Sequence, residues 1–240
     1  MTLPFVSQFA VAPVLANDID TTVIDQKSAH LALRVNFVPV LASISKTKNR
    51  PLIDYQWVSV EALQVQWLMG WFKLWFCHRD TILVKGEHEP EYFAATDTEP
   101  AKIVFAHGFF ASALHEISHW CMAGQKRRLL NDFGYWYAPD GRNEQQQQQF
   151  EQVEILPQAI ECLLTLACNK PFSVSKDNLF ADFDTSQSTF EADVQAQAVK
   201  FWQTGQKLST DAKVLLSQLT KLRPLPLTAF DISHNFIKAN

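Results

Sequence analysis

The stretch HEISH, residues 115 to 119, places His115 and His119 four positions apart, with Glu116 beside the first histidine. On a helix, residues at i and i+4 lie one turn apart on the same face, so both imidazoles could bind one metal ion. A third ligand must come from elsewhere in the chain. A carboxylate there would give the ligand set of zinc hydrolases or that of non-haem iron oxygenases. The spacing therefore predicts a metal site, and a structural histidine pair without catalysis is the alternative.

The third ligand is expected in the segment FEQVEILPQAIECLLTLAC, residues 150 to 168, which follows the histidines and has helical character. Glu154 is the preferred ligand, and Glu151 is the alternative. These two glutamates lie three positions apart and can share a helix face, so the spacing does not separate them. The predicted metal site thus consists of His115, His119 and Glu154.

Other polar residues near HEISH are candidates for catalysis. Glu116 projects about 100° around the helix from His115, and in a peptidase it would be the general base acting on metal-bound water. His107, Tyr135 and Tyr137 are candidates for substrate contact or for supporting the ligands. For the tyrosines, packing in the core is the alternative.

Helical periodicity surrounds the HEISH stretch. The apolar residues Phe110, Leu114, Ile117 and Cys121 follow the i, i+4, i+7, i+11 pattern of an amphipathic helix. Gly124 stands where a helix C-cap favours positive φ. The pattern predicts that HEISH lies in the middle of a helix.

Local sequence patterns predict the other elements. Pro39 limits any strand formed by LRVNFVPVL, residues 33–41, to a sheet edge, and Pro157 is expected to start a second helix or to kink one. Further helices are predicted at 59–76, from about 147, at 188–204 and at 209–222, and short strands at 81–84 and 103–105. The predicted fold class is α+β: a mainly helical single domain with a small sheet and a central HExxH helix that carries a zincin-like metal site.

Composition places the chain among globular proteins. Its 240 residues are 47% hydrophobic and 12% aromatic, which suffices for one core. The formal charge of −4 gives no global positive field, which argues against direct binding to nucleic acid or to an anionic membrane. The apolar run at 65–76 is interrupted by polar residues and is too short to span a bilayer, which takes ~20 apolar residues.

The cysteines and the start of the chain indicate a cytoplasmic protein. The four cysteines form no CxxC pair and no dense framework, as is typical of reduced thiols. The apolar start lacks the basic segment of a signal peptide, because the first Lys or Arg is Lys27.

Three longer stretches of the chain resemble one family. They are IVFAHGFFASALHEISHWCMAGQKRRLLNDFGYWYAPDGR at 103–142, FEQVE with LPQA at 150–159, and KPFSVSKDNLFADF at 170–183. Together they closely resemble the elongation factor P hydroxylase family, over roughly residues 76–201. That family oxidises the modified lysine at the tip of the translation factor EF-P, after another enzyme has attached β-lysine to it.

The resemblance implies metal-dependent hydroxylation that consumes molecular oxygen, rather than proteolysis. It implies Fe(II) as the metal, with His115, His119 and Glu154 as ligands, and it makes Glu116 a group that supports the ligands or handles protons. Elongation factor P, with its β-lysylated lysine, would be the partner. The sequence shows no Arg or Lys clamp for 2-oxoglutarate, which leaves the electron donor open.

A folded protein substrate needs a channel deep enough for a long side chain. Tyr135, Tyr137 and Arg142 are expected at its rim or along it, because aromatic rings can hold an ammonium group. Residues 1–54 have no counterpart in the resemblance and are expected to be an N-terminal extension, partly disordered or the product of a start codon assigned too early. Residues 55–240 would form the metal-dependent hydroxylase domain. A zinc metallopeptidase and a non-catalytic module with a closed metal site are the alternatives.

Overall fold

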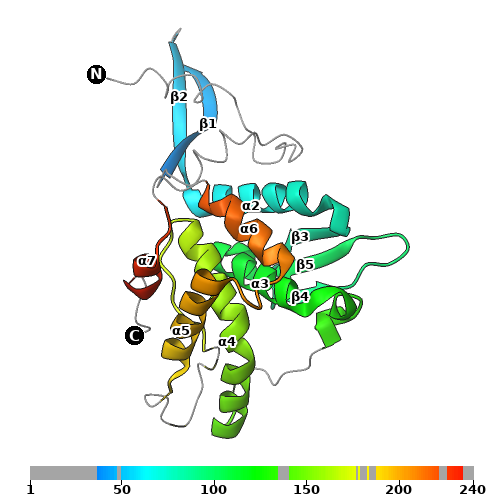
Figure 1. Cartoon of the computed structure of the whole chain (residues 1–240). Helices are drawn as coiled ribbons and strands as arrows, with labels where there is room; N and C mark the ends of the chain where they lie inside the picture. Colours follow the sequence, from blue (N-terminus) through cyan, green and yellow to red (C-terminus); the bar gives the residue numbers. More distant parts are fainter. Residues whose placement is uncertain are drawn as a thin grey trace. The chain divides into compact units, whose positions relative to one another are not determined.

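The protein is described by a computed structural model that covers residues 37–47, 50–134, 141–176, 178, 183, 188–221 and 226–234. For residues 37–60 the backbone alone is described. The chain divides into two compact units, Met1–Trp75 and Phe76–Asn240. Figure 1 shows the elements of both units in sequence colours. The division between an extension at 1–54 and a domain at 55–240 stays a prediction.

The first unit contains an antiparallel ribbon and most of one helix. Strands β1 (Phe37–Thr47) and β2 (Arg50–Ser59) pair in a two-stranded sheet, in which both strands are edges and Pro39 is tolerated. Helix α2 (Val60–Phe76) follows β2 directly, which confirms the helix predicted at 59–76. Of the strand predicted at 33–41, residues 33–36 lie outside the described part of the chain.

The second unit contains a three-stranded sheet of order β3-β5-β4. Strand β3 (Thr81–Lys85) runs parallel to β5 (Ala101–Phe105), and β4 (Glu91–Phe93) runs antiparallel to β5. The central strand β5 buries every second residue, as a half-buried strand should. The predicted strands at 81–84 and 103–105 are confirmed, whereas β4 was not predicted because its three residues are too few to show alternation.

Helix α3 (Phe110–Arg127) carries HEISH, as predicted, and begins after a tight turn that follows β5. Gly108 in this turn has a φ of 73°, and a Cβ there would lie 2.5 Å from the side chain of Lys85. Glycine therefore suits this turn, because a residue with a side chain rarely adopts such a positive φ. Near the other end of α3, Gly124 has a φ of 66°, which confirms the positive φ predicted for it and ends the regular part of the helix.

Helices form the rest of the second unit. Helix α3 packs between β5 and the long helix α4 (Glu144–Ala167), as Figure 1 shows. Helix α4 begins with a capping box between Asn143 and Gln146 and continues through Pro157 as one helix, so the prediction that Pro157 starts a second helix is wrong. Three further helices pack on α4: α5 (Phe190–Thr204), α6 (Thr210–Thr220) and α7 (Ala229–His234). The fold is α+β and mainly helical, in agreement with the coarse prediction.

A buried carboxylate joins the C-terminal end of α3 to the start of α6. Asp211 accepts hydrogen bonds from Arg128, at 2.7 Å, and from Arg79, at 2.9 Å. The Arg128 guanidinium also stacks 3.5 Å above the ring of Trp120 and donates to the Trp120 carbonyl. Because each oxygen of Asp211 serves a different arginine, this one residue fixes three segments of the second unit.

The sheet is tied to the same end of α3. The Tyr92 hydroxyl donates to the Arg128 carbonyl at 2.8 Å, and the Tyr92 ring stacks on Phe133 with ring centres 4.1 Å apart. Backbone N–H groups of β4 and of the residues after it donate to Asp132 and Asn131. Strand β4 is therefore held by the turn that follows α3 as well as by β5.

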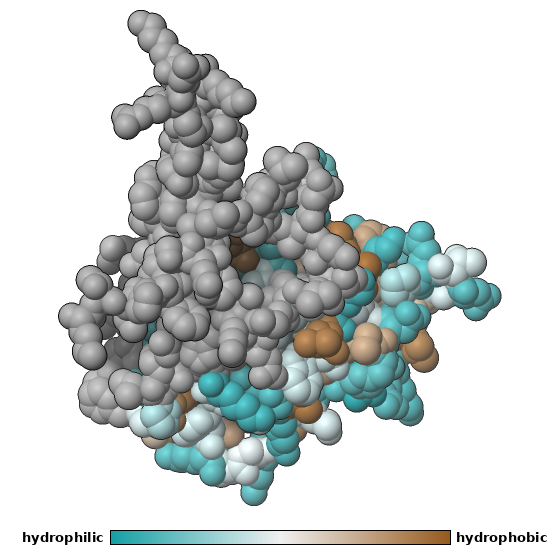
Figure 2. Space-filling view, turned by 90° about the horizontal axis from the view of Figure 1, so that it is seen from above, coloured by the Kyte–Doolittle hydropathy of each residue, from teal (hydrophilic) through white to brown (hydrophobic). Residues whose placement is uncertain are grey.

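Among the described residues of the surface, hydrophobic side chains form small separate patches in a mostly hydrophilic face (Figure 2). Exposed large hydrophobic residues are few: Leu74, Phe93, Phe109, Leu129, Leu130 and Val153. Within the described part of the chain, no helix has both the length and the apolar content that crossing a bilayer requires.

Because Asp211 joins two arginines, replacing it should lower the stability of the fold. In Asp211→Ala, Arg128 loses its buried partner, so the free energy of unfolding should fall by about 3 kcal/mol. Urea unfolding followed by tryptophan fluorescence measures this change. Glu99→Gln, which removes an exposed ion pair with Lys102, is the control and should leave the midpoint unchanged. Equal midpoints for the two variants would contradict the assignment.

Candidate metal centre

The two histidines of HEISH converge on one point beside α3. The Nε2 atoms of His115 and His119 lie 3.0 Å apart, and the ring planes meet at 70°. Both side chains are about one quarter exposed, at 24% and 25%. The opposite face of α3 is anchored by fully buried apolar residues, among them Phe110, Leu114 and Ile117. Burial of this face therefore sets the direction in which the imidazoles point.

Glu154 on α4 completes a group of three possible ligands. Its carboxylate oxygens lie 3.3 Å from His119 Nε2 and 3.8 Å from His115 Nε2. The possible ligand atoms of the three residues all lie within 4.8 Å of one another. Glu151 is not part of this group, and its oxygens accept hydrogen bonds from Gln147 and Ser188 instead. Of the two glutamates that the spacing left open, Glu154 is the one beside the histidines.

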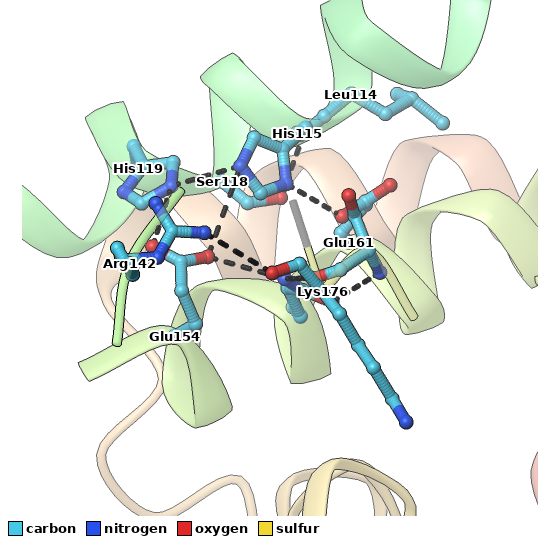
Figure 3. Close-up of polar contacts among 10 residues, drawn as sticks. Leu114, His115, Ser118, His119, Arg142, Glu154, Glu161 and Lys176 are labelled. Carbon is cyan, nitrogen blue, oxygen red and sulfur yellow. Dashed lines mark hydrogen bonds and ion pairs between the residues drawn. The ribbon is translucent and has the colours of Figure 1, made fainter. Parts of the chain in front are cut away.

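A fourth residue, Glu161, lies against the other nitrogen of His115. Its Oε2 atom is 2.8 Å from His115 Nδ1, as the dashed line in Figure 3 marks. No role was predicted for Glu161 from the sequence. Glu161 lies seven residues after Glu154, so both glutamates share one face of α4, and this spacing could have indicated that Glu161 lies near the site. These four residues, His115, His119, Glu154 and Glu161, are called the histidine–glutamate cluster below.

The cluster fits a metal ion. A carboxylate accepts only, so the contact with Glu161 requires a proton on Nδ1 of His115, and in the neutral ring this leaves a lone pair on Nε2. That lone pair faces His119 Nε2 and the Glu154 carboxylate. Two ligands at about 2.1 Å from one ion and at right angles to each other would be about 3 Å apart, close to the separation of the two nitrogens. Nitrogen and oxygen donors of this kind suit iron or zinc.

The charges of the cluster stabilise a cation between the imidazoles. Burial lowers the pKa of His115, but the carboxylates of Glu161, Glu154 and Glu116 outweigh it and raise this pKa to about 10. Burial raises the pKa of Glu154, but His119 and His115 outweigh it and lower this pKa to about 2. Burial raises the pKa of Glu116. A metal ion would take the place of the proton that the carboxylates otherwise favour.

Glu154 is itself held in place by a hydrogen bond. Gln158, one turn later on α4, donates from Nε2 to Glu154 Oε2 at 3.3 Å and to the Ser175 carbonyl at 2.8 Å. The Ser175 N–H donates to Gln158 Oε1 at 2.9 Å. The Gln158 amide therefore cannot turn without losing its contacts with the backbone at Ser175.

The remaining residues singled out from the sequence have different positions. His107 has a positive φ of 51° and is exposed, with its ring near Phe109 and outside the cluster. Tyr135 and Tyr137 lie outside the described residues. Arg142 is buried, and its guanidinium contacts Gln147 and the ring of Phe150 rather than lying at an exposed rim.

Two histidines and a carboxylate that converge from two packed helices form a candidate site for a metal-dependent enzyme. Comparison with known proteins supports an enzyme. The family model described as elongation factor P hydroxylase matches residues 71–226. A protein of Haemophilus influenzae named elongation factor P lysine hydroxylase is 42% identical over 157 residues, which are 64% of this chain and 88% of that protein. The chain belongs to the elongation factor P hydroxylase family and is an enzyme.

The geometry predicts which glutamate supports metal binding. Removing the charge in Glu154→Gln should weaken the binding of Fe(II) or Co(II) by roughly 100-fold or more, because even groups that only orient ligands change affinity 10- to 100-fold. Isothermal titration of the metal-free protein measures the affinity. Glu151→Gln is the matched control on the same helix, and it should bind as tightly as the wild type. The reverse ranking of these two variants would contradict the geometry.

Proposed function

We propose that this protein hydroxylates the β-lysylated lysine side chain of elongation factor P in the cytoplasm, with Fe(II) as the metal and molecular oxygen as cosubstrate. Membership of the hydroxylase family and the name of the Haemophilus influenzae relative support the reaction and the protein substrate. The single structural observation that carries the proposal is the convergence of His115, His119 and Glu154. The family match begins at residue 71, which supports assigning catalysis to residues 55–240.

The three convergent residues are the proposed ligands. Bound Fe(II) would supply the activation of molecular oxygen, since two histidines and one carboxylate leave coordination positions open. Hydroxylation places one oxygen atom into a C–H bond and releases the other as water, so an external reductant must provide two electrons. His115 is oriented by Glu161, and Glu154 is oriented by Gln158. The protein's own contribution to the reaction is therefore to hold the three ligand atoms in fixed directions.

Acidic residues around the site suit an amine substrate. Glu116, Glu154 and Glu161 all interact electrostatically with His115. Their summed field attracts a lysine ammonium group toward the partly exposed imidazoles. Glu116, which neighbours His115 in the chain, is proposed to receive or hold a proton at its carboxylate. His107, Tyr135 and Tyr137 are proposed to contact the substrate, and for the tyrosines a cation–π attraction of ~0.5 to 2 kcal/mol is the expected contribution.

The direct test measures the intact mass of elongation factor P. The factor is co-expressed in air with its lysylating enzymes, in cells that lack their own hydroxylase, with and without this protein. The wild type should add one oxygen atom to the lysylated factor, and His115→Ala should add none because one ligand is missing. His88→Ala, an exposed histidine far from HEISH in the chain, is the control and should be fully active. An unchanged mass with folded, metal-loaded wild type would refute the proposed reaction.

Removing and replacing the metal distinguishes the proposed hydroxylase from a zinc peptidase. Treatment with a chelator should abolish hydroxylation. In air and with an added reductant, Fe(II) should restore it and Zn(II) should not, because zinc is not redox-active. The zinc peptidase alternative, with Glu116 as general base, predicts the opposite pattern. It requires cleavage of peptides by the zinc form without oxygen and loss of that cleavage in Glu116→Gln. Screening both metal forms against a peptide library checks for it.

A further inference from the structure

We propose that Glu161 is a positioning residue that fixes the tautomer and the ring orientation of His115 and so sets the affinity and geometry of the metal site. The inference rests on the proposed ligand set and adds to it a residue that is not itself a ligand. It concerns the edge of the His115 ring that faces away from His119.

The observation is that the His115 ring lies between two carboxylates of one helix. Glu161 contacts Nδ1 at 2.8 Å, and Glu154 lies 3.8 Å from Nε2. The two glutamates are seven residues apart, so their positions on α4 differ by about 10 Å along the helix axis. Their long side chains reach toward each other from two turns away and meet opposite edges of the same ring (Figure 3).

The hydrogen bond to Glu161 determines what the ring can offer at its other nitrogen. An imidazole that donates from Nδ1 must use its Nε2 lone pair for any metal ion. With the Nδ1 proton held by Glu161, that lone pair points to the place where His119 Nε2 and Glu154 converge. Carboxylates that accept from a ligating histidine fix its tautomer and raise its basicity as a ligand.

Burial strengthens the hydrogen bond between Glu161 and His115. The side chain of Glu161 is 9% exposed and that of Glu154 is 7% exposed, so water competes little for either carboxylate. A charge-assisted hydrogen bond in such surroundings is short and strong. Loss of the Glu161 carboxylate would leave the Nδ1–H of His115 without this acceptor and would let the ring turn about its side-chain bonds.

The test compares Glu161→Ala and Glu161→Gln with the wild type. Glu161→Ala removes the acceptor, and Co(II) or Zn(II) should bind about 10- to 100-fold more weakly. Glu161→Gln keeps an oxygen acceptor of the same size, so it should recover part of the lost affinity. Glu151→Ala, on the same helix but outside the cluster, is the matched control and should bind like the wild type. Thermal unfolding of each variant confirms that the compared proteins are folded.

A spectroscopic measurement separates positioning from a purely structural role. In the Co(II)-loaded wild type, the Nδ1 proton of His115 should give a paramagnetically shifted NMR signal that exchanges slowly with water, because Glu161 holds it. The signal should broaden or vanish in Glu161→Ala and persist in Glu161→Gln and Glu151→Ala. Wild-type affinity together with an unchanged signal in Glu161→Ala would overturn this inference and leave the ligand set intact. Failure of the wild type itself to bind metal would overturn the ligand set, and the inference with it.

Discussion

The packing of α3 against α4 is the constraint on which the site depends. The cluster takes its histidines from one helix and its glutamates from the other, and its closest contacts lie between 2.8 and 3.8 Å. If either helix shifted its register by one residue, each side chain would be displaced by about 1.5 Å along the axis and by about 100° around it. Apolar burial on both helices prevents this, because a close-packed interior resists such shifts. The hydrophobic core therefore sets the geometry that the polar residues use.

Helix α4 carries a stripe of polar residues along the face that meets the histidines. The stripe follows a spacing of four and three residues, and it consists of Gln147, Glu151, Glu154, Gln158 and Glu161. Buried polar groups cost stability unless they are hydrogen-bonded, and each member of this stripe has a partner among the described residues. Backbone at Ser175 and Lys176 receives hydrogen bonds from the two glutamines. The stripe thus connects the segment after α4 to the residues beside the histidines.

Sequence periodicity predicted the elements better than it predicted the contacts between them. The helix around HEISH and the strands at 81–84 and 103–105 follow from local patterns of burial, and the structure contains them. Helix α4 begins at Glu144, slightly before the predicted start at about 147, because Asn143 and Gln146 form a capping box there. The contact of Glu161 was not predicted, because it depends on which edge of the His115 ring the carboxylate meets. This contact joins two different helices, so the spacing of residues along α4 alone does not predict it.

The part of the chain that must fold to build the site is the second unit. The family match, residues 71–226, contains the three-stranded sheet, helices α3 to α6 and the Asp211 bridge, whereas the ribbon of β1 and β2 lies outside it. Asp211 binds Arg128, which lies nine residues after His119 at the C-terminal end of α3. Its two arginines hold that end against the start of α6, and the short turn Ala106–Gly108 joins the opposite end directly to β5. With both ends of α3 held, His115 and His119 can still turn about their side-chain bonds, and their contacts with Glu161 and Glu154 are placed to restrict that rotation.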